Sequence, residues 1–81
     1  MKKILLFCKI YRLEVSTIRD FNNYRLGIEF RAANKRNCYF AFPLEYECSL
    51  DEIADKMIHQ VILELKLDRH LLEENDEYQA I

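Results

Sequence analysis

The residues from which nucleophilic and phosphate-binding sites are built are scarce in this chain of 81 residues. Its Ser and Thr hydroxyls are those of Ser16, Thr17 and Ser49, and neither Ser16 nor Thr17 has a nearby His or a nucleophile-elbow context. Gly27 is the single glycine, which excludes a Gly-rich phosphate loop. The sequence therefore argues against phosphate-transfer and dinucleotide chemistry.

Metal chemistry would have to use the cysteines and histidines. These are Cys8, Cys38, Cys48, His59 and His70, and no two of them are separated by the short gaps that zinc sites use. Three cysteines without a C-x-x-C spacing also favour reduced thiols over a disulfide framework. We expect no metal site and no cofactor.

Neighbouring carboxylates are the remaining reagents. Glu45 with Glu47, and Glu73 with Glu74, could supply a general acid and a general base. Alternate positions on a loop or tail do not hold two carboxylates at a fixed spacing across a cleft. The sequence therefore predicts a protein that is not an enzyme.

The clearest element is a helix over residues 50–66. Ser49 and Glu52 match a capping box, in which Ser49 would accept from the N3 amide and Glu52 would reach back to the Ser49 amide. Apolar residues follow at the helical period, which predicts one buried stripe formed by Leu50, Ile53, Ala54, Met57, Ile58, Val61 and Leu65.

Strand patterns precede this helix. Residues 24–32 alternate, which places Tyr24, Leu26, Ile28 and Phe30 on one buried face. Residues 34–37 have turn chemistry, and residues 38–42 follow as the second strand of a hairpin that ends at Pro43.

Both ends of the chain are less regular. Residues 3–15 favour a strand that either contains a bulge or is covered on both faces, and residues 16–23 form a connection with a short turn of helix. Asp68 would cap a short helix or tail over residues 68–81 and offer Leu71 and Leu72 to the core. The order β-β-β-α predicts an α+β fold in one domain, residues 1–81, with a three-stranded antiparallel sheet packed on one long amphipathic helix.

Export and membrane insertion are not indicated. The apolar run of residues 4–8 is shorter than a signal peptide requires, and no stretch reaches the length of a transmembrane helix. We expect a cytoplasmic protein without a membrane partner.

The chain changes sign of charge near its middle. Residues 1–36 hold nine basic and three acidic side chains, whereas residues 37–81 hold three basic and eleven acidic ones, and the net charge is −2. Separation of this kind concerns partners and orientation rather than fold. It predicts a molecule with opposite charged poles.

Two binding functions fit this pattern. The first is a small non-enzymatic protein-binding module, a stoichiometric inhibitor or regulator of a larger protein machine such as a host nucleoprotein or defence complex. Small proteins without catalytic groups that are rich in Asn, Lys and Ile are often encoded by phages or mobile elements. By analogy of composition alone, with no matched motif, anti-defence proteins such as anti-CRISPR proteins are the group this would point to. An edge strand would also permit a homodimer. The predicted partner-binding acids lie on the helix and the tail: Asp51, Glu52, Asp55, Glu64, Glu73, Glu74, Asp76 and Glu77.

The alternative is nucleic-acid binding by the sheet and its hairpin. Basic side chains on the exposed side of the middle strand and at the hairpin tip would contact phosphates, and an aromatic ring would stack on a base. The residues are Arg25, Arg31, Lys35, Arg36 and Tyr39.

Overall fold

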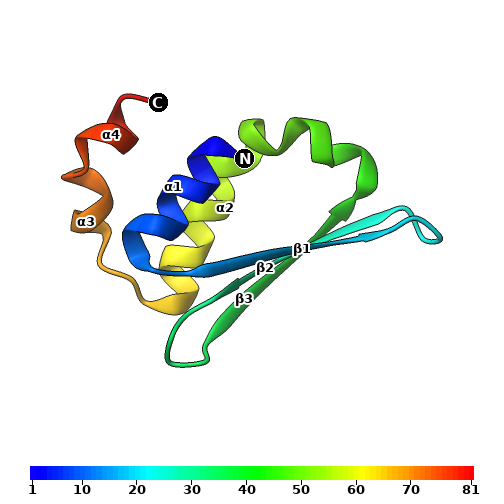
Figure 1. The fold of residues 1–81 in the computed structure, drawn as a ribbon, viewed down its shortest axis with the longest axis horizontal. Helices are drawn as coiled ribbons and strands as arrows, with labels where there is room; N and C mark the ends of the chain where they lie inside the picture. The colour runs from blue at the N-terminus through cyan, green and yellow to red at the C-terminus, as the bar shows by residue number, and fades with distance from the viewer.

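The computed structural model describes all residues, 1–81, and confirms the α+β class (Figure 1). A three-stranded antiparallel sheet in the order β1-β2-β3 is followed by the long helix α2. The elements in chain order are α1 (Lys2–Tyr11), β1 (Glu14–Asp20), β2 (Arg25–Arg31), β3 (Asn37–Pro43), the 3-10 helix η1 (Leu44–Ser49), α2 (Leu50–Leu65), α3 (Arg69–Glu73) and α4 (Asp76–Gln79).

The register of the sheet assigns each strand residue to one of two faces. Leu26, Ile28 and Phe30 on β2 lie opposite Phe42, Phe40 and Cys38 on β3, and this inner face packs against the helices. The predicted strands 24–32 and 38–42 are therefore confirmed to within one residue at each end. Tyr24 is the exception, because its φ of 53° takes it out of the strand and leaves it exposed.

Helix α2 is confirmed, but its predicted capping box is not formed. The buried stripe runs from Leu50 through Met57 and Val61 to Leu65. Ser49 makes no side-chain cap hydrogen bond and has φ −116° and ψ 15°. A capping serine needs an extended backbone, whereas η1 already turns the chain before Ser49, so η1 and α2 continue into each other.

The N-terminal segment is a helix, which corrects the predicted strand over residues 3–15. Ile4, Phe7 and Cys8 are buried at the helical spacing i, i+3, i+4, whereas Leu5 lies 52% exposed on the other side. Phe7 contacts Phe30 of β2 with ring centroids 6.2 Å apart. A five-residue apolar run is short enough to be read as either strand or helix, and packing on α2 and the sheet decides for helix.

The first strand consequently lies later in the chain than expected. Helix α1 ends where Arg12 takes a left-handed conformation, with φ 55°, and Leu13 N donates to Cys8 O at 2.8 Å. β1 then occupies residues 14–20, most of which were predicted to be a connection with a turn of helix. Its register with β2 is continuous from Glu14–Arg31 to Asp20–Arg25.

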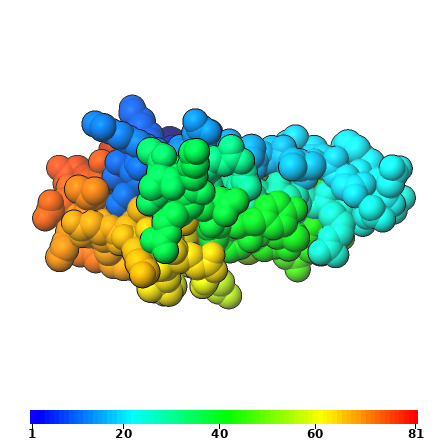
Figure 2. All heavy atoms as spheres, turned by 90° about the horizontal axis from the view of Figure 1, so that it is seen from below, coloured from blue at the N-terminus to red at the C-terminus, as the bar shows by residue number.

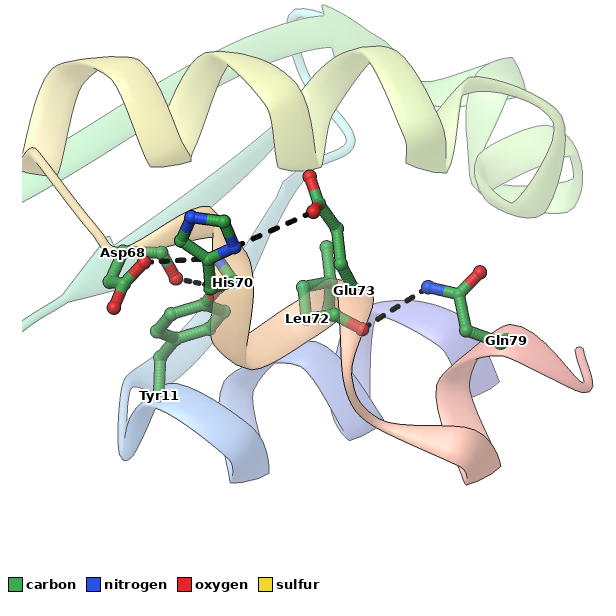
Figure 3. Close-up of polar contacts among 6 residues, drawn as sticks. All are labelled: Tyr11, Asp68, His70, Leu72, Glu73 and Gln79. Carbon is green, nitrogen blue, oxygen red and sulfur yellow. Dashed lines mark hydrogen bonds and ion pairs between the residues drawn. The ribbon is translucent and has the colours of Figure 1, made fainter.

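The C-terminal helices α3 and α4 pack against α1, at the end of the molecule opposite the β1–β2 turn (Figure 1). Asp68 caps α3 as predicted, accepting from His70 N at 3.0 Å, and Tyr11 Oη donates to the Asp68 carbonyl at 2.5 Å (Figure 3). Gln79 on α4 donates to the Leu72 carbonyl at 3.2 Å. Leu72 is buried as expected, but Leu71 is exposed.

The molecule is flat and elongated, with extents of 41 × 29 × 16 Å. Figure 2 shows the β1–β2 turn as a narrow projection beyond the body that contains the helices. None of the helices combines the length and the apolar character that crossing a bilayer would require.

Candidate interaction surface

One face of the sheet is left open by the helices. This outer face carries alternate residues of all three strands: Glu14, Ser16, Ile18, Asp20, Arg25, Gly27, Glu29, Arg31, Asn37, Tyr39 and Ala41. Ile18 and Tyr39 are 63% and 59% exposed there, and Phe21 and Tyr24 in the adjoining turn are 68% and 74% exposed. Isolated exposed apolar residues are ordinary on a protein surface, whereas several large ones near one another are typical of interaction surfaces, so these four side chains form a candidate interaction surface. We call these four side chains the apolar patch.

Gly27 determines how the Tyr39 ring lies. A Cβ atom placed on Gly27 would stand 2.3 Å from Tyr39 Oη and 3.0 Å from Tyr39 Cζ, which is too close for either contact. Tyr39 therefore leans diagonally across β2 and covers the glycine, since only a residue without a side chain leaves that space. The hydroxyl end of the ring thereby rests over Gly27, while the side chain as a whole stays exposed.

The turn that bears Phe21 and Tyr24 is held by Asp20. One carboxylate oxygen accepts from the backbone N–H groups of Asn22 and Asn23 at 3.0 and 3.2 Å, and the other accepts from the Asn23 side-chain amide at 2.8 Å. These bonds, the Asn23 side-chain bond foremost, hold the pKa of Asp20 below its ordinary value. The left-handed Tyr24 is an uncommon conformation for an aromatic residue, and such conformations concentrate at functional sites.

Two hollows flank this turn. One, with a volume of about 530 Å³, is lined on the outer face by Ile18, Asp20, Asn23, Arg25, Gly27 and Tyr39. The other, of about 450 Å³, is lined by Tyr24, Pro43, Leu44 and Glu45. Both are open to solvent, so they suit side chains of a macromolecular partner better than an enclosed small molecule.

A basic cleft lies at the opposite end of the sheet. It has a volume of about 230 Å³ and is lined by Arg12, Glu14, Arg31, Ala32, Ala33 and Lys35. Arg12 at the end of α1 and Lys35 in the β2–β3 turn both have positive φ, 55° and 69°. The fold thus brings Arg12 beside two residues predicted to bind nucleic acid, although Glu14 also faces the cleft.

The predicted nucleic-acid residues do not form one cluster. Arg25 and Arg31 stand at opposite ends of β2, and Tyr39 lies between them on β3. Arg31 pairs with Glu29 at 2.8 Å, and Asn37 donates to the same carboxylate at 3.0 Å. Arg25 instead lines the hollow beside the apolar patch.

The predicted partner-binding acids are also divided, and several are engaged within the molecule. Asp51 pairs with the Met1 amino group at 2.5 Å, and Asp55 pairs with Lys3 at 2.6 Å. Glu64, at the other end of α2, accepts from Cys38 Sγ at 2.9 Å. The acids without an ion pair or side-chain hydrogen bond are Glu52, Glu74, Asp76 and Glu77.

Folding partly mixes the charges that are separated along the sequence. The N-terminal lysines belong to α1, and one of them, Lys3, pairs with Asp55 of α2 and lies 5.1 Å from the centre of the Tyr78 ring of α4. The sheet segment, residues 12–43, keeps six basic side chains against three acidic ones. A positive sheet layer and a negative helical layer remain, with a smaller contrast than the sequence halves indicate.

The two buried thiols, Cys8 and Cys38, lack the properties of nucleophiles. Burial raises the pKa of Cys8 to about 12, and burial with the neighbouring Glu64 carboxylate raises the pKa of Cys38 to about 12, so both thiols stay protonated. Cys48 is exposed. No group of three or more His, Cys, Asp and Glu residues is arranged to hold a metal ion.

Comparison of the chain with protein-family models, with curated proteins and with solved structures gives no match. The assignment of a site therefore depends on the geometry of the chain itself. Sequence reasoning identified Tyr39 and Arg25 but missed Ile18, Phe21 and Tyr24. Ile18 and Phe21 both fall within residues 16–23, which the sequence predicted to be a connection, and their exposure follows from the position of β1.

Proposed function

We propose that this chain is a small non-enzymatic protein-binding module, an inhibitor or regulator that acts by covering a surface of a larger protein. The observation that carries the proposal is the apolar patch, which lies on the open outer face of the sheet and in the projecting β1–β2 turn. Exposed aromatic side chains supply a large contact area at low entropic cost and dominate the energetics of many interfaces.

The placement of the patch supports binding by occupation of a surface. The β1–β2 turn extends beyond α1, α2, α3 and α4, so a partner can reach the patch without contacting these four helices, while η1 borders the hollow at Tyr24. Ile18 and Tyr39 border one hollow and Tyr24 borders the other, which gives the partner two recesses for side chains. Arg25 adds a positive charge beside the first hollow and favours a partner with an acidic rim.

The test is capture of a partner by immobilised wild-type protein and by matched variants. Tyr24→Ser and Tyr39→Ser each remove an exposed ring from the patch, whereas Leu63→Ser removes a similarly exposed apolar side chain from α2. We expect both tyrosine variants to lose the captured partner and the Leu63 variant to keep it. Equal capture by all three variants would reject the patch as the binding site.

Gly27→Ala provides a more specific perturbation of the same site. The added methyl group would displace the Tyr39 ring, and the ring is the end of a flexible side chain that can move, so the fold should persist. Binding should weaken by about tenfold if the Tyr39 ring over Gly27 makes a contact worth about 1.4 kcal/mol. A circular-dichroism melt would show whether the variant remains folded.

The second candidate function is nucleic-acid binding through the basic cleft, and it has its own observation. Arg12, Arg31 and Lys35 converge at one end of the outer face on which Tyr39 lies. Phosphate contacts would make affinity for a labelled single strand fall steeply with salt, and Lys35→Ala with Arg36→Ala would flatten that dependence. No anisotropy change at low salt would reject this candidate.

A further inference from the structure

β1 is an edge strand whose outer side has no backbone partner. It forms the end of the β1-β2-β3 order, and its register with β2 runs without a bulge. Proteins usually protect such edges with charged side chains, lysine above all, with proline or with a bulge. The segment from Glu14 to Asp20 contains no proline, lysine or bulge, and the charges of Arg19 and Asp20 are engaged by Glu47 and by the β1–β2 turn, so the edge can serve as a template for another strand.

The hydrogen bonds around β2 show which backbone groups of β1 face outward. Ala32 N donates to Arg36 O at 2.8 Å, and Leu44 N donates to Tyr24 O at 2.7 Å. The backbone N–H and C=O groups of even-numbered β2 residues therefore point toward β3, and those of odd-numbered β2 residues point toward β1. Odd-numbered β2 residues pair with even-numbered β1 residues, so the backbone groups of the even-numbered β1 residues are hydrogen-bonded to β2. The N–H and C=O groups left facing outward are those of Val15, Thr17 and Arg19.

We propose that the occupant of this edge is a second copy of the chain, paired antiparallel about a twofold axis at Ile18. Thr17 of each copy then lies opposite Arg19 of the other, and both residues present outward N–H and C=O groups for bonding. Ile18 faces Ile18 of the second copy on the outer face. The pairing covers Ile18 and Phe21 of the apolar patch, so a second copy and a different protein partner would compete for these two side chains, whereas Tyr24 and Tyr39 lie outside the paired edge.

Electrostatic repulsion disfavours neighbouring registers in which outer-face side chains of one copy still lie opposite outer-face side chains of the other. An axis at Thr17 would place Glu14 directly opposite Asp20 of the second copy, and like charges in that position are destabilising. An axis at Ser16 would place the Glu14 carboxylate against the exposed Ile18. The axis at Ile18 instead sets Ser16 opposite Asp20, so neither carboxylate meets a like charge.

The same register covers both exposed apolar side chains of the β1 arm. Ile18 is covered by its own copy, and Phe21, the residue that follows β1, comes opposite Val15 of the second copy. The other edge of the sheet is less suited to pairing, because the outward positions of β3 include Pro43, which has no N–H group to donate. The product is a continuous six-stranded sheet in which the two outer faces adjoin.

Sedimentation equilibrium over a range of concentrations tests the dimer. The wild-type protein should approach twice its monomer mass of 9.8 kDa. Ile18→Lys places two ammonium groups at the axis and should weaken association by about tenfold or more. Ala41→Lys is the matched control, since it adds the same charge to an exposed outer-face position on β3. A monomer at all concentrations, or equal weakening by the two variants, would overturn the proposal.

Cysteine cross-linking tests the register. Residues of a non-hydrogen-bonded antiparallel pair lie about 4.5 Å apart at Cα, within the range that a disulfide can span. In a Cys48→Ser background, Ile18→Cys should therefore form a covalent dimer under mild oxidation, and Thr17→Cys should not. Cross-linking of the Thr17 variant in preference to the Ile18 variant would place the axis elsewhere and refute the proposed pairing. Capture of a protein partner is a separate assay, so either result leaves the proposed function independently testable.

Discussion

Replacing Phe7 by Ala tests the helical packing of the N-terminal segment. Phe7 is fully buried and meets the Phe30 ring of the sheet at 6.2 Å and the Tyr11 ring at 5.2 Å. Leu5 is half exposed on the opposite side of α1. In a strand these two residues would share a face, so the pair of substitutions distinguishes the two conformations.

The expected effects differ in size. Removing a buried Phe side chain costs about 3–5 kcal/mol of the free energy of unfolding, because apolar burial is lost and a cavity remains. A domain of this length has a total stability of roughly 4–12 kcal/mol, so Phe7→Ala should remove a large part of it. Leu5→Ala at an exposed helical position should change the free energy of unfolding by no more than about 0.5 kcal/mol.

Urea denaturation followed by circular dichroism measures both values. With an m-value of about 1–3 kcal/mol/M, the Phe7→Ala midpoint should fall by at least about 1 M, and Leu5→Ala should leave the midpoint nearly unchanged. Both measurements need concentrations at which the association states of the variants match. Comparable losses for the two variants would refute the helical assignment of α1 and favour a strand covered on one face.

Three further predictions concern a cap, a pKa and the thiols. Asp68→Ala should lower stability by about 1 kcal/mol and the melting temperature by about 4–8 °C, because the α3 amide loses its side-chain acceptor; an unchanged melting curve would contradict this. The lowered pKa of Asp20 means that its ionised form favours the folded turn at neutral pH. This contribution should be lost as the pH falls below about 3.9 and through the folded-state pKa, so an NMR titration midpoint at or above 3.9 would contradict it. A thiol reagent at pH 8 should label Cys48 in the folded protein and reach Cys8 and Cys38 only on unfolding, and mass spectrometry of the labelled peptides would detect any early reaction at the buried pair.

Several elements could be predicted because the spacing of their apolar residues fits only one type of secondary structure. The stripe from Leu50 to Leu65 spans more than four helical turns, and alternation from Leu26 to Phe30 is compatible only with a half-buried strand. Asp68 was also identified as a cap from its residue type and position. The fold class follows from these elements because the strands and α2 must bury their apolar faces against each other.

Where two local structures were compatible with the sequence, tertiary contacts decided. The apolar run of residues 4–8 became a helix because Phe7 packs on Phe30 and α1 lies along α2. Ser49 lost its predicted cap because η1 turns the backbone before it. In both cases the free energy depends on residues distant in the sequence, which a local period does not contain.

The candidate site shows the same division. The sequence by itself determined the residue types available, the scarcity of nucleophiles and glycine, the positive charge of the sheet segment and the assignment of Arg25 and Tyr39 to strands. Only the tertiary structure decided that Tyr39 covers Gly27, that Ile18, Phe21, Tyr24 and Tyr39 stay exposed, and that Lys3 neutralises Asp55 in the acidic helical layer. The physical reason is that exposure and ion pairing depend on which faces the helices cover, and that depends on packing across the whole chain.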